Sequence, residues 1–138
     1  MRFFETHCTI RATPEKIWPI LTNSSRLQDG FGILRIKGQI TQGAKITIWS
    51  EVAPERAFVL RVKDLTAPRR MVWTGGMPFG LFIGTRAYTL RSLTETQTEF
   101  TLREDYSGPM AALIFPKLPD LTPSFRQFAD ALRKAAES

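Results

Sequence analysis

The chain has 138 residues, 43% of them hydrophobic, and a formal net charge of +6, which predicts one globular domain over residues 1–138 with a core of its own. No apolar run approaches the roughly 18–20 residues of a membrane-spanning helix. The positive residues are dispersed from Arg2 to Lys134, without a zinc-finger, helix-turn-helix or RNP-type motif. We therefore expect no nucleic-acid partner and no stable membrane insertion.

The single cysteine, Cys8, excludes an internal disulfide, and the first residues lack the apolar segment of a secretory signal. A cytoplasmic location is therefore expected.

The first predicted element is a strand over residues 2–12, followed at once by a helix over residues 14–22. Thr13 is placed to cap this helix, and Pro14 occupies the first helical position, where its missing N–H costs nothing. Residues 24–29 predict a further short helical turn before the next strand.

Six more strands are expected, separated by turn-forming residues, as in an antiparallel meander. An apolar loop broken by two prolines follows over residues 110–121. The last element is an amphipathic helix over residues 122–137, whose apolar stripe includes Phe125, Phe128 and Leu132. The predicted strands cover residues 33–40, 44–53, 57–65, 69–76, 83–93 and 97–107.

This order of elements resembles the helix-grip fold of the START/polyketide cyclase (SRPBCC) superfamily. The resemblance rests on the segments 10–18, 71–75 and 98–108, together with the final helix. It implies an α+β fold, in which a seven-stranded antiparallel curved sheet wraps around a long C-terminal helix and two short helices connect strands one and two. The superfamily includes lipid and hormone binders, cyclases, chaperone co-factors and oxygenase domains, so the resemblance implies a fold and no particular chemistry.

Side chains alternate between the two faces of a strand, and the last hairpin has one register that matches both apolar and charged partners. This register brings together Arg86 and Glu104, the two charged residues predicted on the inner face, with Trp73 beside Arg86. Two interpretations stay open: a structural ion pair in a filled core, or a pair that lines a cavity and orients a polar group of an apolar ligand. The same register pairs Leu90 with Phe100 and Tyr88 with Leu102.

The outer face carries an exposed tryptophan, Trp49, for which hairpin pairing predicts Arg35 and Lys63 as neighbours on its two sides. Glu51 is expected opposite Arg61. Cation–π contact accounts for this arrangement more simply than nucleic-acid stacking does.

The expected ligand-binding residues lie on the inner face of the sheet and on the final helix: Trp73, Arg86, Tyr88, Leu102, Glu104, Tyr106, Phe125, Phe128 and Leu132. Two apolar loops are expected to border the mouth of the cavity through Phe79, Phe82, Leu113 and Phe115. Cover for the core, a homodimer contact and a membrane surface are the alternatives for these loops.

Catalytic and metal-binding patterns are sparse in this sequence. His7 is the one histidine and is assigned outward, and Cys8 faces inward without a histidine nearby, so neither a metal site nor a cofactor is expected. Glu104 is the candidate acid or base.

The predicted function is binding of a small, largely apolar ligand such as a lipid, a sterol or an aromatic polyketide. The alternatives are a cyclase or dehydratase that uses Glu104, and an adaptor or co-chaperone-like module that binds another protein through the apolar loops.

Overall fold

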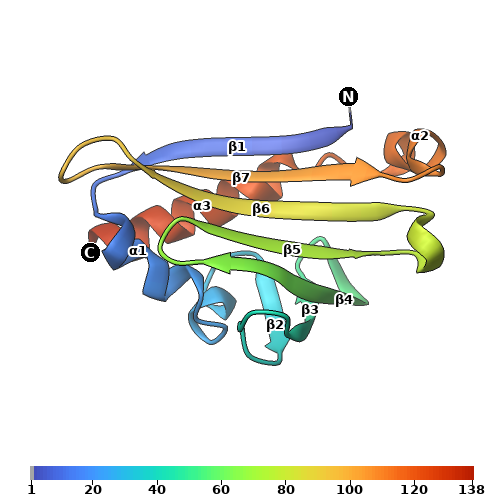
Figure 1. The fold of residues 1–138 in the computed structure, drawn as a ribbon, viewed down its shortest axis with the longest axis horizontal. Helices are drawn as coiled ribbons and strands as arrows, with labels where there is room; N and C mark the ends of the chain where they lie inside the picture. The colour runs from blue at the N-terminus through green and yellow to red at the C-terminus, as the bar shows by residue number, and fades with distance from the viewer. Residues whose placement is uncertain (1) are drawn as a thin grey trace.

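The computed structural model describes residues 2–138 and contains a seven-stranded antiparallel sheet with a long C-terminal helix running behind it (Figure 1). The strand order is β1-β7-β6-β5-β4-β3-β2, so the last three strands lie between the first strand and β4. The predicted fold class is confirmed. The elements are β1 (Phe3–Ile10), α1 (Pro14–Leu21), η1 (Arg26–Gln28), β2 (Ile33–Lys37), β3 (Lys45–Ser50), β4 (Ala53–Thr66), β5 (Arg70–Gly76), η2 (Pro78–Gly80), β6 (Ile83–Ser92), β7 (Thr98–Ser107), α2 (Ala111–Ile114), η3 (Phe115–Lys117) and α3 (Thr122–Glu137).

The corner between β1 and α1 is fixed by short-range hydrogen bonds. The Thr13 hydroxyl accepts a bond from the Lys16 backbone N–H at 3.2 Å, as expected of an N-cap. The buried hydroxyl of Thr98 donates to the Ala12 carbonyl at 2.7 Å. This second bond ties the start of β7 to the corner and satisfies a polar group that would be costly to bury alone.

The hydrophobic core lies between the sheet and the apolar face of α3. Phe125, Phe128 and Leu132 are each at most 3% exposed. Phe128 packs edge-on against Phe31, with ring centroids 5.1 Å apart, and its ring is tilted against that of Tyr88, with centroids 5.3 Å apart. The stripe predicted on this helix therefore forms one wall of the core.

The hairpin between β3 and β4 differs from the prediction. The chain turns at Glu51 and Val52, and β4 begins at Ala53 instead of residue 57. The sequence around Pro54 favours a turn, but proline is also tolerated at the start of a strand, where it need not donate a ladder hydrogen bond. Because the turn comes earlier than predicted, each residue of β3 pairs with a residue of β4 closer to the turn in sequence than expected.

The shifted register corrects the predicted neighbours of Trp49. Arg35 does pair with Trp49, and its guanidinium carbon lies 5.2 Å from the ring centroid. Lys63 is not a neighbour, because β3 pairs Ile48 with Phe58. The expected opposition of Glu51 and Arg61 is wrong for the same reason, since Arg61 pairs with Lys45 and Thr74.

The apolar loops lie at one end of the sheet, where Figure 1 shows α2 and the β5–β6 connection on the same side. The Met110 backbone N–H donates to the Leu81 carbonyl at 2.9 Å and joins the two segments. The segment predicted as a loop over residues 110–121 contains two short helical turns, α2 and η3.

Candidate functional site

An ion pair between Arg86 and Glu104 crosses from β6 to β7 on the inner face. The two residues are direct cross-strand partners. The Arg86 Nε donates to Glu104 Oε1 at 2.5 Å, with the side chains 27% and 16% exposed. The contact predicted from the register of this hairpin is confirmed.

Two aromatic residues lie next to Arg86. Trp73 is its cross-strand partner on β5. The Phe125 ring of α3 lies with its centroid 4.9 Å from the guanidinium carbon, a distance suited to a cation–π contact. Arg86 is therefore held between a carboxylate on one side and the helix on the other.

The environment fixes the protonation of the groups around this pair. Burial opposes the charge on Arg86, but the Glu104 carboxylate outweighs that effect and the pKa of Arg86 is raised above its ordinary value. Burial raises the pKa of Tyr88 to about 12. The pKa of Tyr106 is also raised, by burial and then by the negative charge of Glu104. At neutral pH the site thus holds a guanidinium cation and two neutral phenols.

A cavity of about 670 Å³ opens between α3 and the inner face of the sheet, next to this pair. Phe82 stacks on Tyr106 in its wall, with ring centroids 5.6 Å apart and planes 12° apart. The predicted site residues that line the cavity are Trp73, Arg86, Leu102, Glu104, Tyr106, Phe125 and Phe128, together with Phe82 from the predicted mouth.

The remaining predicted residues do not line this cavity. Tyr88 is fully buried behind Trp73, at 4.8 Å between ring centroids, and Leu132 is buried in the core. Phe115 packs on Tyr106, with ring centroids 5.4 Å apart. Phe79 and Leu113 are 98% and 57% exposed.

Two glycines create part of the space in the cavity. Gly75 on β5 and Gly84 on β6 are cross-strand partners, and both line the cavity. A Cβ atom on Gly84 would lie 3.0 Å from Glu104 Oε2, and one on Gly75 would lie 2.4 Å from Leu60 Cδ2. Strand alternation, which places residues 75 and 84 on the same face as 73 and 86, could have identified this pair.

The predicted site residues also left out residues that other elements contribute to the cavity wall, although strand alternation places Ile48 and Phe58 on the inner face. Strands β3 and β4, the segment before α3 and the first turn of α3 supply them, and the pairing of β3 with β4 and the path of residues 110–121 bring them close. They are Ile48, Arg56, Phe58, Ile114, Leu118, Leu121 and Ser124.

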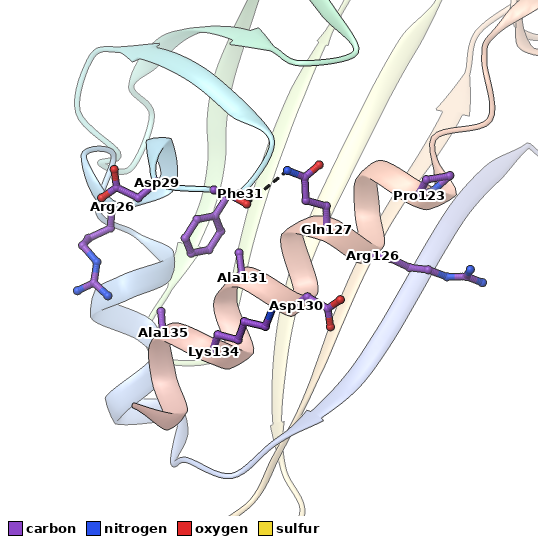
Figure 2. Close-up of a pocket in the computed structure, with 11 residues that line it drawn as sticks. Arg26, Asp29, Phe31, Pro123, Arg126, Gln127, Asp130, Ala131, Lys134 and Ala135 are labelled. Carbon is purple, nitrogen blue, oxygen red and sulfur yellow. Dashed lines mark hydrogen bonds between the residues drawn. The ribbon is translucent and has the colours of Figure 1, made fainter.

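A second hollow, of about 910 Å³, lies between α3 and the segment 26–31. Figure 2 shows Gln127 reaching across it, where its Nε2 donates to the Gly30 carbonyl at 3.4 Å. Charged side chains of both signs line this groove, and Arg26 and Arg126 are exposed. The groove lacks the buried aromatic wall and the inward ion pair of the cavity, so the cavity is the better candidate site.

Within residues 2–138, no group of three or more His, Cys, Asp and Glu side chains could hold a metal ion. None of the helices in this part of the chain is long and apolar enough to cross a membrane.

No family model and no curated relative matches the chain. Similar solved structures include the Zhui aromatase/cyclase from Streptomyces sp. R1128, with a TM-score of 0.78 and 17% identity over 99% of this chain and 93% of that one. They also include DynU16, from the dynemicin biosynthetic locus, with a TM-score of 0.74 and 16% identity; this chain is covered in full and spans 48% of that chain.

Norcoclaurine synthase from Thalictrum flavum, solved with dopamine and hydroxybenzaldehyde, matches with a TM-score of 0.70 and 12% identity over 96% of this chain and 84% of that one. The chain therefore shares the helix-grip fold of these structures, as predicted from its sequence.

Proposed function

We propose that this protein binds a small, largely apolar ligand in the cavity between the sheet and α3. The observation that carries the proposal is the cavity itself. Its volume of about 670 Å³ falls within the roughly 300–1,000 Å³ of small-molecule sites, which are mostly apolar with a few well-placed polar groups. The aromatic wall around Arg86 and Glu104 has that composition.

The ion pair supports a ligand-orienting role for these two residues. A buried ion pair is rarely more stable than well-packed apolar side chains of similar volume. Arg86 and Glu104 both line the cavity and keep part of their side-chain surface accessible. A pair in this position can hold a polar group of the ligand while the rings of Trp73 and Phe125 cover its apolar body.

Filling the cavity tests this proposal. Ser124 lines the cavity from α3, so we expect Ser124→Trp to block ligands while leaving the sheet intact. Arg126→Trp adds the same ring to the exposed, groove-facing side of the same helix and serves as the control. A ligand at 100 times its dissociation constant stabilises a protein by about 2.7 kcal/mol. Wild type and the control should gain this stability with naphthalene-sized ligands, and the Ser124→Trp variant should not.

A second candidate function is that of a cyclase- or dehydratase-like enzyme with Glu104 as general acid or base. The similarity in fold to an aromatase/cyclase favours it, as does the accessible carboxylate of Glu104 within the cavity. For any aromatic polyketide substrate that is turned over, Glu104→Gln should lower kcat by about 10²–10⁴-fold. A binding protein would show no turnover, and the same variant would alter only affinity.

A further inference from the structure

The Arg86–Glu104 pair leaves hydrogen-bonding groups of both kinds unused. Arg86 reaches Glu104 through Nε, and its Nη1 and Nη2 make no well-formed hydrogen bond to residues 2–138, although the Tyr88 hydroxyl lies near the guanidinium. Glu104 accepts at Oε1, and its Oε2 accepts no well-formed hydrogen bond from the same range, although the Tyr106 hydroxyl lies near the carboxylate. Gly84 leaves space directly beside Oε2. The Arg86 Nη donors and the Glu104 Oε2 acceptor therefore lie side by side at the cavity wall.

Three further buried polar atoms near the pair lack partners. The Trp73 indole N–H and the hydroxyls of Tyr88 and Tyr106 make no well-formed hydrogen bond within the described residues. Trp73 is 1% exposed and Tyr106 is 8% exposed. An unsatisfied buried polar group costs about 1–3 kcal/mol, so a ligand whose polar group came within reach of the Trp73 or Tyr106 atom would recover part of that cost.

The charge balance limits what that polar group can be. Arg86 and Glu104 neutralise each other, and a third charge placed against the pair would lack a counter-charge in a partly desolvated site. Arg56 is the other charged residue that lines the cavity, and it lies exposed at the rim with its guanidinium carbon 5.0 Å from the Phe58 ring centroid. Solvent screens its charge there.

We infer that the ligand's polar end is uncharged and carries a carbonyl acceptor next to an O–H or N–H donor, as in a hydroxy-ketone or a primary amide. The carbonyl oxygen faces the Arg86 Nη atoms, and the donor faces Glu104 Oε2. This inference rests on the proposed function, because it assigns chemistry to a ligand in the same cavity. It excludes fatty-acid carboxylates and amines as the preferred ligands.

A series of probes with one apolar body tests the inference. The probes are 2-naphthamide, methyl 2-naphthoate, 2-naphthoate and naphthalen-2-ylmethylamine, each titrated calorimetrically into the full chain at pH 7. We expect 2-naphthamide to bind about tenfold more tightly than either charged probe, and more tightly than the ester, which lacks the donor. A charged probe that binds as tightly as the amide, or an ester equal to it, would overturn the inference.

The outcomes separate this inference from the proposed function. Equal affinity for all four probes means that the cavity binds apolar molecules without using the ion pair, which overturns the inference and leaves the proposed function standing. Absence of binding by every probe contradicts both.

Charge variants add a second, independent test. Glu104→Gln leaves Arg86 as an unpaired cation, so the preferred probe should change to 2-naphthoate. Glu99→Gln is the matched control, because Glu99 pairs with Arg91 on the same two strands at 2.9 Å and is 31% exposed outside the cavity. The control should keep the wild-type order of probes. An unchanged order in folded Glu104→Gln protein, judged by its near-UV circular dichroism, would contradict the inference.

Discussion

Gly84 lies directly across from Tyr106 on the inner face of β6 and β7, two residues along each strand from the Arg86–Glu104 pair. An added Cβ at this glycine would lie 3.0 Å from Glu104 Oε2 and 3.6 Å from Tyr106 Cε1. The missing side chain therefore gives the carboxylate its place at the cavity wall.

Gly84→Ala should weaken ligand binding by displacing the Glu104 carboxylate. We expect about a tenfold loss of affinity for 2-naphthamide, since one charge-assisted hydrogen bond is worth roughly 1.5–3 kcal/mol. Titration calorimetry measures the loss. Thr85→Ala, on the opposite face of the same strand, is the control and should bind normally. Unchanged affinity in the Gly84 variant would show that Glu104 Oε2 does not contact the ligand.

Arg86 and Glu104 should be coupled in stability. Arg86→Met and Glu104→Leu each leave the other charge unpaired, and because both side chains keep some exposure we expect each to cost about 1–3 kcal/mol, less than a fully buried pair. The double variant should recover most of that free energy of unfolding while still losing affinity for the ligand. Urea denaturation of the four proteins completes the cycle. Two single effects that simply add would show that the residues are independent.

Phe79 combines two unfavourable features, a left-handed φ of 61° and 98% exposure. Asparagine tolerates this conformation better than a bulky residue does. We expect Phe79→Asn to raise the free energy of unfolding by up to about 1 kcal/mol and to leave 2-naphthamide binding unchanged. Thermal denaturation measures the change. Phe82→Asn, which removes the ring stacked on Tyr106, should lower both stability and affinity. A destabilised Phe79 variant would mean that this ring contributes to packing.

Because the pKa of Tyr88 is raised, we expect the free energy of unfolding to fall at high pH. The pKa of Tyr88 is raised to about 12 by burial, from an ordinary value of 10.0. The folded state therefore holds this proton more tightly than the unfolded state does. The resulting stability is fully present below pH 10 and is lost between pH 10 and 12, at about 1.4 kcal/mol per pH unit.

Comparison with Tyr88→Phe isolates this contribution from other groups that titrate at high pH. The free energy of unfolding of the variant, measured from pH 8 to 12, should fall less steeply than that of wild type above pH 10. Parallel curves for the two proteins would show that the Tyr88 hydroxyl is not desolvated.

Strand alternation and hairpin register were sufficient to predict the ion pair. Only one alignment of β6 with β7 matches the apolar partners and also brings Arg86 to Glu104. The hairpin between β3 and β4 was predicted wrongly because Pro54 resembles a turn residue but begins a strand. Local sequence could not distinguish these two uses of proline.

The sequence predicted which residues face the interior better than it predicted which of them line the cavity. Strand alternation assigned Tyr88 to the interior, and the apolar stripe of the last helix assigned Leu132 there; both are buried, but neither reaches the cavity. Position along the sheet and the path of α3 decide which inward residues meet a ligand. The space also depends on side chains that are missing, as at Gly75 and Gly84, and an apolar pattern does not reveal them.

The central claim, that a small apolar ligand binds between the sheet and α3, is tested most directly by the indole N–H signals of the chain's three tryptophans in a nitrogen-15 NMR spectrum. Trp73 lines the cavity, whereas Trp18 and Trp49 do not. Saturating 2-naphthamide should shift the Trp73 indole signal strongly and leave the other two in place. Shifts confined to Trp18 or Trp49, or backbone shifts gathered in residues 26–31 and 126–135 around the outer groove, would contradict the claim.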